Sequence, residues 1–190
     1  MRFSRNTRLY LAYGSNLHPI RLNGRLPSSR LLATIELHQC RLAFHKRGMD
    51  GSGKCDLIPE QDDHLSLGAL YQIAVDEIGE LDRLEGGYQQ VELELELDRQ
   101  RLIAFTYQAR PEKIDPSLLP FDWYRSLIEA GGDYLGFPTN PRRDLQQFDV
   151  QSDSNSERAA HHLQLLQAIQ EFNQLRQTPK LATGKLLGWL

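Results

Sequence analysis

The sequence has few cysteines, no long apolar run and almost no net charge. Two cysteines, Cys40 and Cys55, are too few for a disulfide framework, so we expect two reduced thiols. No stretch approaches the roughly 20 apolar residues of a membrane span. The apolar run that follows the basic start stops at Gly14, which is too short for the core of a signal peptide. These absences predict a soluble, cytoplasmic protein with no membrane partner.

The charge balance excludes another class of partner. Among 190 residues, 25 acidic and 22 basic side chains give a net charge of −3. This balance provides no overall attraction to DNA or RNA, so no nucleic-acid partner is expected. Apolar residues make up 40% of the chain, which excludes disorder along its whole length. The length suits one domain, or one domain with an appendage.

The usual signatures of metal sites and of activated nucleophiles are missing too. The six histidines are dispersed, and the only adjacent pair is His161 and His162. Neighbouring residues point to different sides of a helix and do not form a two-histidine face. There is no Cys-x-x-Cys, no His-x-x-x-His and no Gly-x-Ser-x-Gly. We therefore expect no metal.

One segment imitates a nucleotide-binding loop. Residues 48–54, Gly-Met-Asp-Gly-Ser-Gly-Lys, fit the pattern G-x-x-x-x-G-K, but Cys55 replaces the hydroxyl residue that would bind magnesium. A phosphate-binding loop also opens a helix. Here a short apolar run and Pro59 follow, so nucleotide binding would require a helix that the sequence does not predict. A Gly/Ser-rich hairpin loop is favoured.

Strands dominate the first 110 residues. The clearest is Val91–Leu97, in which apolar residues alternate with Glu without a break. This pattern is typical of an antiparallel strand with one buried and one solvated face. The predicted strands cover residues 9–13, 31–45 (long or bent, with a bulge near 38–39), 55–58, 67–73, 91–97 and 102–108. Their hairpin-length connections favour an α+β fold with a mainly antiparallel, barrel-like core.

Four helices are predicted between and after these strands. The first covers residues 18–26, with Asn16 as its cap, and the second is a short segment from Asp76 with Ile78, Leu81 and Leu84 on one side. The third covers residues 117–130, with Leu119, Trp123 and Leu127 on one apolar stripe. The fourth covers residues 157–177, and its apolar stripe consists of Leu165, Ile169, Phe172 and Leu175. Gly86–Gly87 and Gly131–Gly132 are expected to end the second and third helices. Residues 147–190 resemble a polar linker, an amphipathic helix and an apolar tip. We therefore divide the chain into a domain of residues 1–146 and an extension of residues 147–190.

Two local features suggest chemistry. The first is the strand-to-helix turn Tyr13-Gly-Ser-Asn-Leu17, where Gly14 permits a positive φ and a close approach of the backbone to a ligand. Exposed N–H groups at such a turn form a nest for a carboxylate or phosphate. A simple capped turn is the alternative, and it is the commoner one.

The second feature is Glu85, in the last turn of the short helix before Gly86–Gly87. A carboxylate there faces the negative end of the helix dipole, which raises its pKa. Such a residue suits a general base. The alternative is a solvated glutamate that precedes a glycine cap.

Taken together, these segments resemble the gamma-glutamylcyclotransferase-like superfamily. The resemblance rests on Tyr10 to Leu17, on Gly68 to Tyr71, on Leu81-Asp-x-x-Glu85-Gly86, and on Phe121-Asp-Trp-Tyr124 with the glycines that follow, in the family order. It covers roughly residues 8 to 145.

The resemblance implies a small mixed β-barrel flanked by helices. It also implies cyclisation of a γ-glutamyl amino acid or amine to 5-oxoproline, with Glu85 as the general acid/base. By the same resemblance, the loop of Tyr13, Gly14, Ser15, Asn16 and Leu17 holds the glutamyl group, and Tyr124 lies close to the substrate. Tyr124, Tyr13 and Tyr88 are equally compatible with packing roles.

The chemistry is consistent with these parts. The α-amine of the substrate must lose a proton before it attacks its own γ-carbonyl, and a carboxylate takes that proton and returns it to the leaving amine. No metal or organic cofactor is required. The only expected partner is the small γ-glutamyl substrate, and the protein is expected to be a monomer or homodimer. The rival hypothesis is a non-catalytic module that binds a carboxylate-bearing metabolite on the same fold.

Overall fold

Six strands close into a barrel in the computed structural model, which describes residues 6–62 and 64–190. Around the barrel the order is β1 (Thr7–Ala12), β5 (Leu65–Ala74), β2 (Arg30–His38), β8 (Ala182–Trp189), β6 (Tyr88–Leu97) and β7 (Gln100–Ala109). The β1–β7 and β2–β8 pairs are parallel and the other four are antiparallel. The predicted α+β class with a mixed, mainly antiparallel barrel flanked by helices is confirmed.

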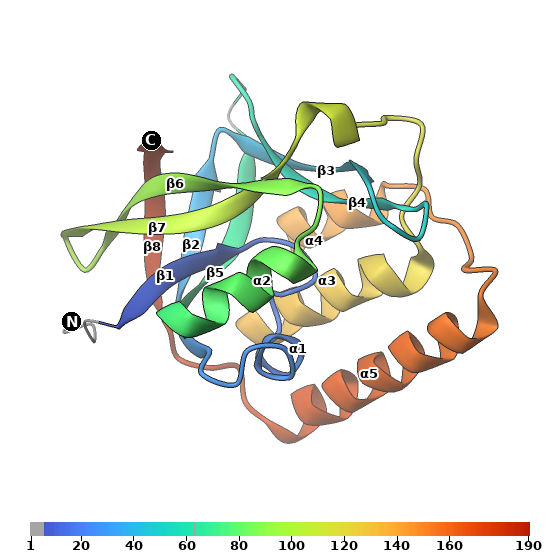
Figure 1. The fold of residues 1–190 in the computed structure, drawn as a ribbon. Coiled ribbons are helices and arrows are strands. Elements are labelled where there is room, and N and C mark those ends of the chain that lie inside the picture. The colour runs from blue at the N-terminus through green and yellow to red at the C-terminus, as the bar shows by residue number, and fades with distance from the viewer. Residues whose placement is uncertain (1–5, 63) are drawn as a thin grey trace.

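Outside the barrel, the described residues form one hairpin and five α-helices. The hairpin pairs β3 (Cys40–Arg47) with β4 (Gly53–Pro59). The helices are α1 (Pro19–Asn23), α2 (Ile78–Leu84), α3 (Asp122–Leu135), α4 (Thr139–Gln146) and α5 (Ser156–Leu175), with 3-10 turns at Val75–Glu77 and Pro111–Lys113. In Figure 1 the first and last strands, β1 and β8, lie on the barrel side of the molecule, and α1, α3 and α5 gather on the other side. No described helix is long and apolar enough to cross a bilayer.

The alternation in β6 has the predicted effect. Leu93, Leu95 and Leu97 are buried in the barrel, whereas the glutamates between them are partly or fully exposed. Asp98 and Arg99 both have positive φ, 51° and 63°. Two such residues make the tight turn whose twist matches an antiparallel hairpin, and β7 follows in register.

The end of the chain is not an apolar tip. Residues 182–189 form β8, which lies between β2 and β6 and closes the barrel (Figure 1). The expected boundary between residues 146 and 147 therefore separates one barrel strand from the other five. This role could not be predicted from the sequence, because the alternation of residues in a strand does not indicate which distant strands pair with it.

The predicted strand 31–45 is two strands in two different sheets. Gln39 takes a positive φ of 55° between β2 and β3, where a bulge was expected. The chain leaves the barrel at this residue, and β3 pairs with β4 instead. Alternation continues on both sides of Gln39, so periodicity could not distinguish one strand from two.

The helix predicted over 117–130 begins and ends later. It is α3, Asp122–Leu135, and Gly136 with φ 70° ends it in place of Gly131–Gly132. Leu119 lies outside it and is 39% exposed. Gly131 has a packing role instead: a Cβ there would lie 2.7 Å from the Cβ of Leu17 and 3.2 Å from the backbone nitrogen of His18. The missing side chain lets α3 contact the loop after β1.

Three further details of the helices differ from expectation. The cap of α1 is His18, whose Nδ1 accepts from the backbone N–H of Ile20, and not Asn16. Asp76 lies inside a 3-10 turn that has no side-chain cap. In α5, Leu166 and Ile169 are buried, while Leu175 of the expected stripe is 85% exposed. α5 packs along α3, so part of its apolar surface faces that helix.

We predict opposite effects of alanine at two helical glycines. Gly131→Ala should lower the free energy of unfolding by roughly 1–3 kcal/mol, because the new methyl overlaps Leu17. Gly79→Ala in α2 meets nothing within 4 Å and should raise it by about 0.5–1 kcal/mol. Urea titration of the two variants measures both changes, and stabilisation by Gly131→Ala would contradict the packing described here.

We also predict that residues 1–146 do not fold alone. Such a chain lacks β8, which leaves β2 and β6 as open edges in place of a closed barrel. Circular dichroism during thermal unfolding should show no cooperative transition, in contrast to the full chain. Restoring residues 147–190 as a separate peptide is a control for the missing strand; cooperative unfolding of residues 1–146 alone would show that β8 is dispensable.

Candidate active site

A small cavity of about 30 Å³ lies where the loop after β1, the end of α2, β4 and α3 meet. Its lining is Tyr10, Tyr13, Gly14, Ser15, Asn16, Cys55, Glu85, Tyr88, Tyr107 and Tyr124. We call it the inner cavity. Six of the seven residues proposed as site residues from the sequence line it: Glu85, Tyr13, Gly14, Ser15, Asn16 and Tyr124.

Leu17 is the exception. Its side chain is 2% exposed and lines a separate, larger cavity of about 340 Å³ on the other side of the loop. Its carbonyl accepts a hydrogen bond from the hydroxyl of Tyr71 at 2.7 Å. Leu17 therefore anchors the loop to the core and does not face the inner cavity.

Glu85 ends α2, and its carboxylate turns toward the loop after β1. The residue is half-buried and caps the helix with φ −93° and ψ 34°, before Gly87 at φ 86°. Burial raises the pKa of this carboxyl, while Arg25 and Lys46 oppose the rise. A raised pKa was expected from the helix dipole, and desolvation is its largest cause.

The amide of Asn16 connects the groups around Glu85. Its Nδ2 donates to Oε1 of Glu85 at 2.9 Å and to the hydroxyl of Tyr10 at 3.2 Å. Its Oδ1 accepts from Arg25 at 2.9 Å. Asn16 is 3% exposed, so its amide is committed to these partners and not to capping α1.

The tyrosines of the inner cavity divide into two kinds. Tyr13 donates to the carbonyl of Tyr107 at 2.5 Å, and Tyr88 donates to the carbonyl of Cys55 at 2.7 Å. The hydroxyl of Tyr124 instead accepts from the backbone N–H of Cys55 at 3.2 Å and has no acceptor of its own among the described residues. Burial raises the pKa of Tyr124, so the phenol stays neutral and keeps a proton to donate.

The loop itself supplies further donors. No hydrogen bond within the described residues uses the backbone N–H of Ser15 or Asn16, while Leu17 donates to the carbonyl of Gly14 at 3.0 Å. Gly14 does not take the positive φ that a glycine permits. Its importance is proximity, because a Cβ there would lie 3.4 Å from Cβ of Cys55 and 3.7 Å from the hydroxyl of Tyr124.

A second cavity of about 240 Å³ adjoins the first, and we call it the outer cavity. Ser15, Glu85, Tyr88 and Tyr124 line both, so the Glu85 carboxylate lies at their junction. The outer cavity is rich in cations: Arg21, Arg25, Lys46 and Lys54 line it. Lys46 donates to the carbonyl of Gly86 at 2.6 Å and lies over the ring of Tyr88.

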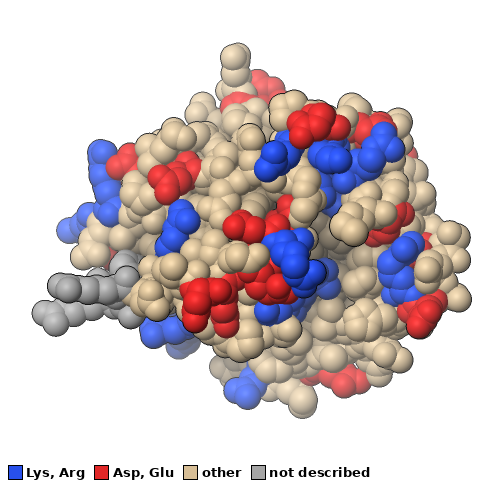
Figure 2. Space-filling model, viewed as in Figure 1, with Lys and Arg blue, Asp and Glu red and all other residues tan. Residues whose placement is uncertain are grey.

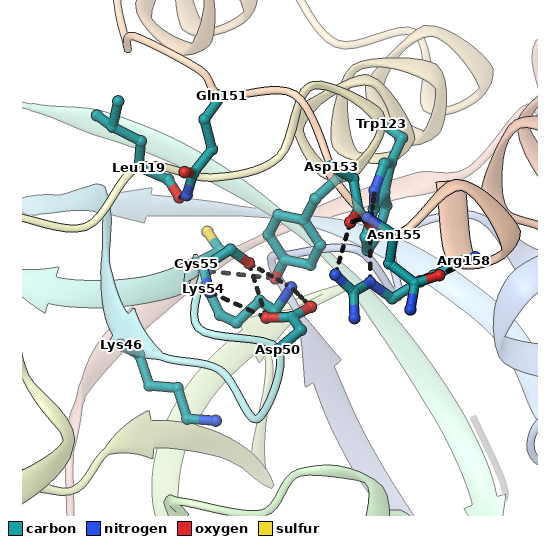
Figure 3. Close-up of polar contacts among 12 residues, drawn as sticks. Lys46, Asp50, Lys54, Cys55, Leu119, Trp123, Gln151, Asp153, Asn155 and Arg158 are labelled. Atoms are coloured by element: carbon teal, nitrogen blue, oxygen red, sulfur yellow. Dashed lines mark hydrogen bonds and ion pairs between the residues drawn. The ribbon is translucent and has the colours of Figure 1, made fainter. Parts of the chain in front are cut away.

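The segment that imitates a phosphate-binding loop is the hairpin turn between β3 and β4, as predicted. Lys54 is the second residue of strand β4 and does not open a helix, and its Nζ donates to Asp50 at 2.7 Å and to Ser52 at 2.8 Å. Figure 3 shows Lys54 and Asp50 turned toward each other, with Lys46 on a different part of the hairpin. A lysine bound in this way is not available to a phosphate.

The extension forms part of the site. Asp153 accepts from Nε1 of Trp123 at 3.0 Å and from two guanidinium nitrogens of Arg158 (Figure 3), which lowers its pKa to about 2. This contact docks α5 on α3. His162 then stacks on Trp123, with ring centroids 3.7 Å apart, and lines the outer cavity.

Sequence reasoning missed the outer cavity entirely. Arg21, Arg25 and Lys46 carry no motif, and only the fold brings them beside Glu85. Figure 2 shows that acidic and basic side chains alternate over the face of the molecule drawn in Figure 1, so no patch of one sign marks the site. In the described part of the chain, no group of three or more His, Cys, Asp or Glu residues could hold a metal.

The fold is that of gamma-glutamyl cyclotransferases. A structure named gamma-glutamyl cyclotransferase matches 85% of this chain and 99% of its own with a TM-score of 0.72 and 20% identity. An uncharacterized protein from Homo sapiens matches 86% and 99% with a TM-score of 0.73 and 20% identity. YkqA from Bacillus subtilis matches 77% of this chain and 57% of its own, with a TM-score of 0.63 and 18% identity. No protein-family model and no curated protein matches the sequence.

We predict that Arg25 holds down the pKa of Glu85. Arg25→Gln removes the largest electrostatic influence that favours the carboxylate, so the pKa of Glu85 should rise further. A ¹³C NMR titration of the glutamate carboxyls measures it. Arg83→Gln is the matched control, since Arg83 pairs with Glu80 on the exposed side of α2. An unchanged Glu85 titration in Arg25→Gln would refute the assignment.

Proposed function

We propose that this chain, which has the gamma-glutamyl cyclotransferase fold, is an enzyme that converts a γ-glutamyl amino acid or amine to 5-oxoproline and releases the amino acid or amine. The observation that carries the proposal is the position of Glu85. Its carboxylate lies at the junction of two cavities, beside unused backbone N–H groups and a tyrosine hydroxyl with a free proton. These are a base and the donors that the cyclisation needs.

Glu85 acts first as the general base. The ammonium of the glutamyl group enters the inner cavity and transfers a proton to the carboxylate, and the free amine attacks the γ-carbonyl of the same molecule. A raised pKa brings Glu85 closer to the operating pH, which makes the protonated form a better acid for the return step. The leaving nitrogen receives that proton as its bond to the γ-carbon breaks. The α-nitrogen loses its second proton after the attack, and Glu85 passes this proton too to the released amine, which departs as an ammonium group.

The loop and Tyr124 hold the reacting carbonyl. The developing oxyanion accepts from the N–H groups of Ser15 and Asn16 or from the hydroxyl of Tyr124, all at the wall of the inner cavity. Because the attack is intramolecular, most of the enzyme's contribution is to fold the substrate into the reactive conformer. The inner cavity of about 30 Å³ has room for the ammonium alone, so the rest of the glutamyl group lies at the junction with the outer cavity.

We predict that Glu85→Gln slows the release of 5-oxoproline by about 100-fold or more, because the amide takes no proton. The measurement uses a panel of γ-glutamyl dipeptides and amides, with 5-oxoproline quantified after incubation. Glu80→Gln is the matched control, since Glu80 lies on the same helix but is exposed and pairs with Arg83. The control should keep wild-type activity.

The pH profile gives a second measurement on the same proteins. A general base must be ionised, so activity should be present above the pKa of Glu85 and be lost as pH falls through it. Wild-type rates in Glu85→Gln would remove Glu85 from the mechanism. If the wild type forms no product from any panel member but binds some of them, the fold serves as a carboxylate-binding module instead.

A further inference from the structure

The guanidinium of Arg21 is buried and makes no hydrogen bond or ion pair among the described residues, although the carboxylate of Glu85 attracts it at longer range. Arg21 lies on α1 and is 7% exposed, and its Nε has no hydrogen-bond partner. Among the described residues, no acceptor takes a hydrogen bond from its other nitrogens either. Burial lowers the pKa of Arg21 to about 10, which still leaves the group charged at neutral pH. A desolvated charge without a partner is costly, so the site is incomplete as it stands.

The unpaired guanidinium belongs to the outer cavity. The other three cations there already have partners: Arg25 donates to Asn16, Lys46 to the carbonyl of Gly86, and Lys54 to Asp50. Of the acidic groups that line the cavity, Asp50 is bound to Lys54 and Glu85 to Asn16. Arg21 is therefore the cation left for a ligand.

We propose that the outer cavity binds the carboxylate of the departing amino acid and that Arg21 is the residue that selects for it. This proposal rests on the proposed function. It narrows the substrate class from γ-glutamyl compounds in general to those whose leaving portion carries a carboxylate. A planar guanidinium matches a carboxylate with two parallel hydrogen bonds, which an uncharged amine cannot replace.

The arrangement of the two cavities assigns the carboxylate to the leaving portion. Arg21 lines the outer cavity but not the inner one, whereas Glu85 and Tyr124 line both. In this proposal the ammonium of the substrate occupies the inner cavity, which at about 30 Å³ is too small for the rest of the glutamyl group, and the substituent on the γ-carbonyl extends outward toward Arg21. The stacked rings of Trp123 and His162 form a flat wall there, against which the side chain of the leaving amino acid would pack.

The step conserves atoms and charge without a co-reactant. A bond forms between the α-nitrogen and the γ-carbon, and the bond between that carbon and the leaving nitrogen breaks. The α-ammonium loses two protons in all, one before the attack and one after it, and Glu85 passes them to the leaving nitrogen, which departs as an ammonium group. Arg21 contacts the departing carboxylate and not the reacting atoms, so it is a specificity residue.

The test compares two substrates that differ by one carboxylate, γ-glutamylalanine and γ-glutamylethylamide. For the wild type, kcat/KM should be higher for γ-glutamylalanine. In Arg21→Met it should fall by on the order of 10- to 100-fold for γ-glutamylalanine, the loss expected for a hydrogen-bonded charge, and by less than about threefold for the ethylamide. Arg21→Lys should restore part of the preference. Arg83→Met, on the exposed surface, should change neither value.

Two outcomes would overturn the proposal. Equal losses for both substrates would mean that Arg21 holds the glutamyl portion or the fold, and an unchanged preference would mean that it contacts neither. Calorimetry of both compounds with the Glu85→Gln variant, with and without Arg21→Met, measures the contribution of Arg21 to binding separately from its effect on the reaction. If the wild type releases no 5-oxoproline, an Arg21-dependent preference in binding still supports the anion site. Absence of that preference, or of any binding, refutes it.

Discussion

The carboxylate of Glu85 is partly shielded from water and therefore needs hydrogen-bond donors around it. The side-chain amide of Asn16 is one of these donors, and it also links Glu85 to neighbouring segments. Asn16 donates to Glu85 and Tyr10 and accepts from Arg25, so the loop after β1, the end of α2 and the segment after α1 are held to one point. Burial raises the pKa of Glu85, and the neighbouring cations oppose the rise. The charge state of Glu85 therefore depends on the whole arrangement.

That arrangement requires close packing elsewhere. Gly131 allows α3 to approach the loop after β1, and the same helix brings Tyr124 to the backbone of Cys55. The barrel is closed by β8, whose connection to the rest of the chain runs through α5. α5 in turn is docked on α3 by Asp153 and Arg158 and places His162 in the outer cavity. The last quarter of the chain thus both closes the barrel and contributes to the wall of the outer cavity.

The two cavities differ in the kind of group they suit. The inner one offers neutral donors and a single carboxylate, which fits an amine and a carbonyl that must exchange a proton. The outer one contains a buried cation with no partner among the described residues. A reaction that retains one portion of its substrate and releases the other would use such a division, and the proposed cyclisation is a reaction of this kind.

The sequence by itself determined the elements whose signals are local. The alternation in β6, the hairpin at residues 48–54, and Glu85 at a helix end before two glycines were all readable, because neighbours along the chain produce them. Only the tertiary structure decided that β8 closes the barrel, that Gly131 is a contact and not a cap, and that Arg21 lies unpaired beside the site. Asn16 and Glu85 are 69 residues apart. Periodicity reports which face of an element is buried, but the partner buried against it depends on how distant segments pack.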